Sequence, residues 1–414
     1  MGKANSYWPS MAALPSNKPA PMKISAIRPV GLQMPVKHVA LLQVETDAGL
    51  VGIGSTSAPI GVIAALIEDI EPLLLGRDPT DPTGLWRLMF EGWQAQRGRG
   101  GEGGVAVNAM AAIDMALWDL TGKAQDKAIH QLLGGAIQDR IMAYASATAY
   151  DYTGSLAAGK RIFKSTEKLV AECHAYLAQG FKAIKFGWGN RFGGEQIEQI
   201  GAMRQAVGPE VHLMLDFGCP AYNGDGWTVD TAIEVVNKLE PFRLFFFEEA
   251  LQPYDVAGFA ALKAASSTPI ATGESLVTLT DFDHFIQRKA VDVLQADAQQ
   301  IGITVFDEVA RRAEATDILC IPHCPWTALA FAAHLQVLSV RRNCPMIEYI
   351  ALAGFAGVPF LEPLQYGMTT RIVETPPVFE DGYLLLNERP GLGLGQFVME
   401  AIAEVDALEP IEFP

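Results

Sequence analysis

From residue 140 onward, short apolar segments alternate with longer segments of helical periodicity, and this alternation limits the possible folds more than any other feature. Strands separated by helix-length connections are typical of βα units and a parallel sheet. Eight such apolar segments occur: RIMAYASA, KAIKFGW, VHLMLDF, LFFFEEA, PIATGE, DVLQAD, DILCIPH and PMIEYI. Eight βα units in succession favour a closed (β/α) barrel over an open sheet, so we predict a barrel across residues 140–365.

The chain before residue 140 has a different pattern. Residues 23–35 and 38–54 predict a small antiparallel sheet with a turn at Asp47-Ala48-Gly49. Helices are expected at residues 61–75 and 105–133, and the second is apolar on nearly every face, which indicates a buried helix.

The C-terminal segments DGYLLLNE and PGLGLGQF are expected to return to this first domain. We therefore predict an α+β domain made of residues 22–139 and 366–414, beside the barrel of residues 140–365. Residues 1–21 contain Pro and Ser and predict a flexible tail.

Composition excludes several classes of partner. The formal net charge of −16 argues against nucleic acid and anionic membranes, since both bind clustered Lys and Arg. No apolar run reaches the ~18 residues of a membrane helix, and the N-terminus lacks a secretory pattern. Five cysteines without a paired framework favour a reducing compartment, so a cytoplasmic location is expected.

Two motifs have an alternative interpretation. Cys320 and Cys324 flank His323 and could indicate a soft-metal site, but strand alternation places both thiols opposite the histidine. The glycine clusters at residues 97–104 and 391–395 lack the strand and helix context of a phosphate loop. We expect a mobile loop, with the possible role of a lid, for the first cluster and a turn for the second.

Acidic residues end several consecutive predicted strands, where a barrel gathers its active-site groups. The residues at these strand ends are Asp216, Glu248, Glu249, Glu274, Asp297 and the single histidine His323. Each acid taken alone could be a solvated strand end or a helix cap. Together they would repel one another unless a cation lay among them, and hard oxygen ligands on adjacent strands suit Mg²⁺.

The order of these motifs resembles the mandelate racemase group of the enolase superfamily. The barrel motifs are Asp216, FFEEA, TGES, LQADAQQIG, IPH and MIEY, and the similarity extends to MKISAIRP, VETDAGLVGIG, LLGRDPTD and AAIDMALWDLTGKA in the first domain. The resemblance covers about residues 22–400. It implies a modified (β/α)7β barrel with an N-terminal α+β capping domain that the C-terminal segment completes.

The resemblance also implies a role for each matching residue. Asp216, Glu248 and Glu274 would bind Mg²⁺, and His323 would be a catalytic base oriented by Asp297. Lys185 matches the first lysine of the family's K-x-K motif, and Glu348 matches an acid that contacts the substrate carboxylate. The chain departs from the family pattern at three positions, which are Gly187 for the second lysine, Ala250 for a proline and Gly218 for an asparagine.

Removing a proton next to a carboxylate places a second negative charge on its oxygens, which a divalent ion and a lysine can stabilise. Three carboxylates, one Mg²⁺ and Lys185 sum to a charge near zero, so we interpret Lys185 as an electrostatic partner of the substrate rather than as a base. With Gly187 in place of a second lysine, a base is evident on one face only. This favours β-elimination of water by His323 and predicts an acid-sugar (aldonate or aldarate) dehydratase.

Other functions stay open at this point. A sugar-lactone cycloisomerase or an epimerase would use the same residues, and a non-catalytic barrel could bind a metal and an acid sugar. A homo-oligomer between dimer and octamer is implied by resemblance. Candidate substrate-binding residues lie around residues 30–38 and 55–60, in the glycine-rich loop and at the strand ends: Lys37, His38, Arg97, Arg99, Trp188 and Glu249.

Overall fold

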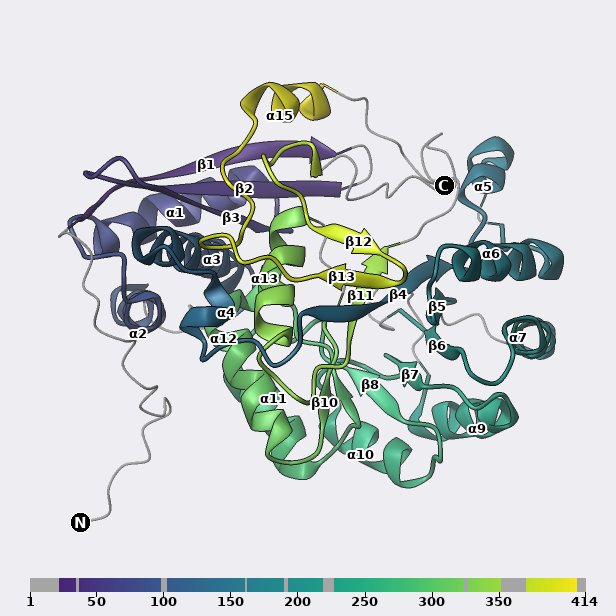
Figure 1. Cartoon of the computed structure of the whole chain (residues 1–414). Helices are drawn as coiled ribbons and strands as arrows, with labels where there is room; N and C mark the ends of the chain where they lie inside the picture. The colour runs from purple at the N-terminus through teal and green to yellow at the C-terminus, as the bar shows by residue number, and fades with distance from the viewer. Residues whose placement is uncertain are drawn as a thin grey trace, which may run out of the picture.

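The first domain of this computed structural model is built on a three-stranded antiparallel sheet (Figure 1). The structure describes residues 22–34, 37–97, 103–160, 162–189, 193–218, 227–323, 327–350 and 370–407. The sheet has the order β1 (Ile24–Met34), β2 (Lys37–Thr46) and β3 (Val51–Thr56). The turn expected at residues 47–49 joins β2 to β3, and Gly49 supplies the positive φ of 79° that the turn requires.

Four helices accompany this sheet: α1 (Ile60–Leu74), α2 (Pro82–Arg97), α3 (Val105–Gln125) and α4 (Ile129–Leu132). α3 is buried along most of its length, as its apolar composition predicted. The sequence analysis did not include α2, although a start signal was present. The Asp81 carboxylate accepts the Gly84 N–H at 2.9 Å, and Pro82 occupies the first helical position, where its missing N–H costs nothing.

All eight predicted barrel segments contain a strand. In chain order these are β4 (Arg140–Thr148), β5 (Ala183–Gly187), β6 (His212–Asp216), β7 (Phe246–Glu248), β8 (Ile270–Thr272), β9 (Val293–Leu294), β10 (Leu319–Cys320) and β11 (Met346–Ile350). Neighbours from β4 to β10 pair in parallel, and β11 pairs in parallel with β4. The Cys320 N–H donates to Asn343 O at 2.9 Å, which links β10 to the residues just before β11.

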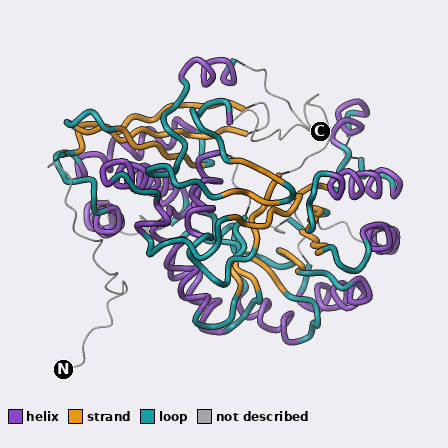
Figure 2. Tube along the Cα trace, in the orientation of Figure 1, coloured by secondary structure: helices purple, strands orange, loops and turns teal. Residues whose placement is uncertain are grey.

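The helices of the barrel lie outside its strands (Figure 2). They are α5 (Tyr152–Ala158), α6 (Thr166–Ala178), α7 (Gly194–Val207), α9 (Val229–Leu239) with the short 3₁₀ turn Glu240–Phe242, α10 (Val256–Ala264), α11 (Leu279–Arg288), α12 (Ala298–Glu314) and α13 (Ala328–Leu338). Several begin at a side chain that caps the helix, such as Thr278 before α11 and Thr327 before α13. These caps fix where each loop ends and the next helix starts.

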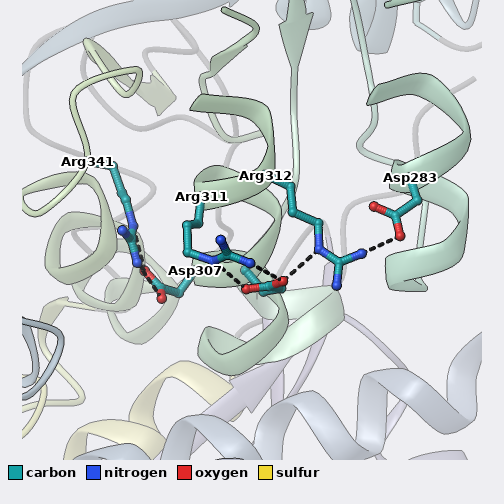
Figure 3. Close-up of polar contacts among 6 residues, drawn as sticks. Asp283, Asp307, Arg311, Arg312 and Arg341 are labelled. Carbon is teal, nitrogen blue, oxygen red and sulfur yellow. Dashed lines mark hydrogen bonds and ion pairs between the residues drawn. The ribbon is translucent and has the colours of Figure 1, made fainter. Parts of the chain in front are cut away.

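Ion pairs connect the outer helices on one side of the barrel (Figure 3). Glu308 of α12 accepts bonds from Arg311 and Arg312, and Arg312 reaches Asp283 of α11. The preceding residue, Asp307, receives two bonds of 2.6 and 2.7 Å from Arg341, which follows α13. Asp307 and Glu308 are buried, Asp283 is partly buried and Arg311 is exposed. The network connects three consecutive helical segments and so fixes their spacing.

The C-terminal segment is divided between the two domains. It contains β12 (Val378–Glu380), β13 (Tyr383–Leu385) and α15 (Met399–Asp406). We expected DGYLLLNE to return to the first domain, but β13 pairs antiparallel with β4 of the barrel, which corrects that expectation. The strand with which an apolar segment pairs depends on the tertiary fold and cannot be predicted from the segment itself. The PGLGLGQF segment does contact the first domain, because the Leu392 N–H donates to Asp119 of α3 at 2.9 Å.

One buried cluster fills the interior of the barrel beneath its C-terminal rim. Its members come from all eight strands or from the residues directly beside them, and they are Tyr144, Ala183, Met214, Phe246, Ala271, Val293, Ile321 and Met346. A separate, larger cluster lies between strands and helices and extends into the first domain. The inner cluster forms the floor of the candidate site.

Several expectations concern residues outside the described ranges. These are the tail at residues 1–21, most of the glycine-rich loop, and Cys219 and Cys324. Cys320 is a buried free thiol. In the described part of the chain, no helix is both long enough and apolar enough to cross a membrane.

Candidate active site

A layer of polar residues lies directly above the inner apolar cluster. Because side chains alternate along a strand, the residue two places after an inward-facing apolar residue also faces inward, one step nearer the C-terminal rim. Applied to the inner cluster, this rule gives Ser146, Lys185, Asp216, Glu248, Gly273, Gln295, His323 and Glu348. This layer contains five of the site residues expected from the sequence, which are Lys185, Asp216, Glu248, His323 and Glu348. Glu274 and Asp297 follow Gly273 and Gln295 along the chain by one and two places.

Lys185 is the centre of a buried charge cluster. Its Nζ lies 2.7 Å from Glu248 Oε2, 2.9 Å from Glu348 Oε1 and 3.5 Å from Asp216 Oδ2. Burial lowers the pKa of Lys185, but the carboxylates of Glu248 and Glu348 outweigh it and raise the pKa well above its usual value. Lys185 therefore lies among carboxylates that stabilise its charged form, which favours the role of an electrostatic partner over that of a base.

Glu348 is held by two partners on its Oε1 atom. Ser146 Oγ donates to it at 2.5 Å, and Lys185 lies on the same oxygen. The other oxygen, Oε2, is buried and has no hydrogen-bond partner among the described residues. Burial raises the pKa of Glu348, but Lys185 and His323 reverse this and lower it, so the group is a carboxylate whose Oε2 has no partner in the described part of the chain.

His323 lies between two acids. Its Nδ1 is 3.2 Å from Asp297 Oδ2, and its Nε2 is 3.4 Å from Glu274 Oε2. Burial lowers the pKa of His323, but the charges of Glu274 and Asp297 raise it to about 9. The contact with Asp297 keeps a proton on Nδ1, so Nε2 is the nitrogen at which the ring gains or loses its second proton.

Asp216, Glu248 and Glu274 follow one another at or just after the ends of β6, β7 and β8. Burial, with the neighbouring charge of Asp216, raises the pKa of Glu248 and Glu274. Glu248 Oε1 is buried without a hydrogen-bond partner among the described residues, and the Gly218 N–H orients Asp216 by donating to Oδ1 at 2.6 Å. These hard oxygens fit a divalent cation chemically.

The side chains are not already gathered around one point. In the described ranges, no three His, Cys, Asp or Glu side chains are arranged so that they could hold a metal ion. Lys185 and His323 instead lie against Glu248 and Glu274 as counter-charges. Binding a cation therefore requires these carboxylates to turn away from their present partners.

Gly187 leaves open space at the position of the second lysine. A Cβ atom there would meet, among the described residues, only Ala147 O at 3.7 Å. Trp188 is fully buried and its ring lies beside that of Phe186, with centroids 6.3 Å apart. Glu249 is also buried and has a φ of 51°, an uncommon conformation for a residue of this size.

The candidate specificity residues of the first domain are only partly described. Lys37 and His38 begin β2 and Arg97 ends α2, but their side chains are outside the described set, and Arg99 lies outside the described residues. Ser55 of β3 is buried and its hydroxyl lies 2.8 Å from that of Thr327, the cap of α13. This contact places the end of β3 against the segment that follows His323.

Sequence analysis missed three residues of this region. The alternation of side chains along the strands could have identified Ser146 and Gln295. Gln295 is fully buried, and neither polar atom of its amide has a hydrogen-bond partner among the described residues. The third residue, His334 of α13, lies in a helix of almost entirely apolar residues, which indicates a core position. It is indeed fully buried, but its Nε2 lies 3.2 Å from Asp297 Oδ1, a contact that no sequence pattern indicated.

Comparisons with known proteins agree with this architecture. The family model "Enolase C-terminal domain-like" matches residues 168–396, and "Mandelate racemase / muconate lactonizing enzyme, N-terminal domain" matches residues 14–134. The chain is 28% identical to the D-galactarolactone cycloisomerase of Agrobacterium fabrum, across 90% of this chain and 92% of that protein. It is 29% identical to the arabinonate dehydratase of Saccharolobus solfataricus, across 88% and 89%.

One similar solved structure contains a bound metal and a bound sugar acid. The L-talarate dehydratase from Polaromonas sp. JS666, complexed with Mg and L-glucarate, has a TM-score of 0.76 and 27% sequence identity, and the match covers 92% of this chain and 97% of that one. The matched regions include both the first domain and the barrel.

Proposed function

The chain belongs to the mandelate racemase/muconate lactonizing enzyme family of the enolase superfamily, and on this premise we propose that it is a Mg²⁺-dependent acid-sugar dehydratase. Its substrate would be an aldonate or aldarate, and its product a 2-keto-3-deoxy acid. The observation that carries the proposal is the combination of one imidazole held by an acid, His323 with Asp297, and one lysine fixed by three carboxylates.

The metal would be held by Asp216, Glu248 and Glu274, and when bound it supplies positive charge at the substrate carboxylate. Lys185 adds a second positive charge beside it. Glu348 would accept a hydrogen bond from the substrate through Oε2, its oxygen without a partner among the described residues. These groups orient the acid end of the sugar and lower the energy of the charge that develops there.

His323 would perform the proton transfers. Its Nε2 takes the proton from C2, and the electron pair of that C–H bond moves toward the carboxylate to give an enediolate. The C3–O bond then breaks, and the same Nε2–H gives its proton to the departing hydroxide, which leaves as water. The resulting enol then tautomerises: C3 gains a proton and the hydroxyl on C2 loses one, which yields the 2-keto-3-deoxy acid.

Gly187 supports elimination over racemisation. Inversion of a carbon centre needs a proton acceptor on each face, and position 187 carries no side chain. A cycloisomerase is the second candidate, because relatives of similar identity have that activity in their names and the same single base would serve it. A non-catalytic acid-sugar binder would gain little from an imidazole oriented in this way.

The proposal is tested by incubating the enzyme with a panel of aldonates, aldarates and their lactones in D₂O with Mg²⁺. We expect one acid sugar to give a 2-keto acid, and His323→Asn to lower turnover at least about 10³-fold, as expected for loss of an essential general base. A lactone rearranged without keto acid would indicate the cycloisomerase. Deuteration with recovered, inverted substrate would indicate an epimerase, and turnover that survives EDTA would overturn the metal assignment.

We also propose that the protein assembles as a homo-oligomer, between dimer and octamer, in the cytoplasm. Light scattering on the purified protein measures the assembly directly. A monomer at micromolar concentration would contradict it.

A further inference from the structure

The carboxylate of Asp297 is shared between the start of a helix and the catalytic histidine. Asp297 is the N-cap residue of α12, and its Oδ1 accepts the Gln299 N–H at 2.8 Å. Its other oxygen, Oδ2, faces His323 Nδ1 at 3.2 Å. The first N–H groups of a helix lack partners within the helix, so they attract any nearby acceptor.

His334 accepts a hydrogen bond from the neighbouring N–H group, that of Ala298. Its Nε2 accepts the Ala298 N–H, the first of α12, at 2.8 Å, and the same nitrogen lies 3.2 Å from Asp297 Oδ1. The ring is fully buried and packs beside Phe306 with centroids 5.1 Å apart. Since Nε2 accepts, the ring proton is on Nδ1, which has no hydrogen-bond partner among the described residues.

Two side chains therefore satisfy two consecutive N–H groups at the beginning of α12. Without His334, the Ala298 N–H would be buried without its acceptor, which is unfavourable. The Asp297 carboxylate is an acceptor at the same helix start, since its Oδ1 lies 3.2 Å from His334 Nε2, and serving the Ala298 N–H would turn it from His323. The competition is between a backbone donor and the catalytic histidine for the same acid.

We propose that His334 is a positioning residue for catalysis: by accepting the Ala298 N–H, it leaves Asp297 Oδ2 available to orient His323. This inference rests on the proposed role of His323 as the base. His334 does not contact His323 in the described structure and acts only through Asp297. Its loss should affect the rate of the proton transfer more than the binding of substrate.

Three variants test this inference. His334→Leu removes the acceptor at similar volume, whereas His334→Gln retains an oxygen near the position of Nε2. His130→Leu is the matched control, because His130 is also buried and contacts Gln336 of α13 at 2.8 Å without touching Asp297. Each variant is compared with wild type in kcat and KM per folded molecule, in melting temperature, and in the His323 Nδ1 to Asp297 Oδ2 distance in crystal structures.

We expect His334→Leu to lower kcat about 10- to 100-fold with KM changed less than about threefold, because misplacing a catalytic group costs rate rather than binding. The distance from His323 Nδ1 to Asp297 Oδ2 should lengthen in His334→Leu. In His334→Gln, both kcat and this distance should return most of the way to their wild-type values. His130→Leu should lower the melting temperature only. A wild-type kcat in His334→Leu, or equal losses in the Leu and Gln variants, would overturn the inference.

Failure of the proposed function gives a different result. If the wild-type enzyme turns over none of the acid sugars, the base assignment of His323 is lost. The crystallographic distance still decides whether His334 positions Asp297, because it requires no activity. An unchanged distance in His334→Leu would overturn the positioning role regardless of the reaction.

Discussion

Two glycines near the site differ in what an added side chain would meet. A Cβ at Gly187 would have only Ala147 O at 3.7 Å among the described residues, and its φ lies outside the left-handed region. A Cβ at Gly302 would lie 2.6 Å from Asp114 Oδ2, and Gly302 has a φ of 76°. We expect Gly187→Ala to change the free energy of unfolding by less than about 1 kcal/mol.

Gly302→Ala is the matched comparison, and we expect it to cost about 2 kcal/mol or more, because it combines a left-handed backbone with a steric conflict. Chemical denaturation of the two variants beside wild type measures both values. Equal losses would mean that the space at position 187 is filled in solution. That result would contradict the open surroundings of the Cβ position at residue 187.

The residues of the site differ in how far the sequence could identify them. Lys185, Glu248 and His323 were identifiable because each ends an apolar strand, and alternation sends them to the same layer. Ser146 lies in the same layer by the same alternation, but it carries no charge that would mark it as a candidate site residue. His334 could not be identified, because its role depends on where α13 packs against the start of α12, and residues 36 positions apart meet there only in the folded chain.

At the level of elements, α12 is interrupted and a side chain from the first domain caps its second part. Gly302 breaks the helical conformation with φ 76° and ψ 167°. Asp114 of α3 then accepts the Thr304 N–H at 2.9 Å and the Thr304 hydroxyl at 2.6 Å. A carboxylate of one domain thus replaces the cap that a break in a barrel helix requires.

This capping carboxylate makes stability depend on pH. Burial raises the pKa of Asp114 from 3.8 to about 7, against the opposing effect of its bonds to Thr304. Between these values the folded protein keeps the proton and the unfolded chain releases it. The stabilisation is complete below the lower value and is lost as pH rises toward 7, by up to about 4 kcal/mol.

The prediction is checked by the difference in unfolding free energy between wild type and Asp114→Asn. Since Asn does not titrate, this difference should move in favour of the variant as pH rises from roughly 4 to 8. Comparing the two proteins at each pH cancels the contribution of other buried acids. A difference that stays constant with pH would show that Asp114 has an ordinary pKa in the fold.

Most of the strands and helices could be predicted from the sequence. Eight apolar segments gave eight strands because a buried parallel strand has to be apolar on both faces. The placement of β13 was not predictable, since a three-residue strand pairs with whichever edge the rest of the fold offers. For α2, the start signal at Asp81 and Pro82 was local and could have been recognised.

For the whole molecule, one residue of α3 connects three distant parts of the chain. Asp119 Oδ2 accepts the Ile53 N–H of β3 at 3.0 Å, and Oδ1 accepts the Leu392 N–H at 2.9 Å. Lys123 lies 2.6 Å from Asp119 and donates to Gly395 O at 2.9 Å. The buried ion pair of Asp119 and Lys123 therefore attaches the C-terminal segment to β3 and α3 of the first domain, a contact that the linear pattern does not reveal.

We predict that Asp119→Asn costs about 3 kcal/mol, because the amide leaves Lys123 without its charge partner and cannot present an acceptor to every donor around it. The loss should be greatest at the contacts of Asp119, so hydrogen exchange should accelerate at the Ile53 and Leu392 amides before it does in the barrel strands. Asp126→Asn is the control, since Asp126 is exposed at the end of the same helix in a left-handed conformation that Asn also adopts. If exchange at Leu392 were equally slow in both variants, the C-terminal segment would be held by packing of Leu392 and Leu394, and the buried pair would be incidental to its attachment to the first domain.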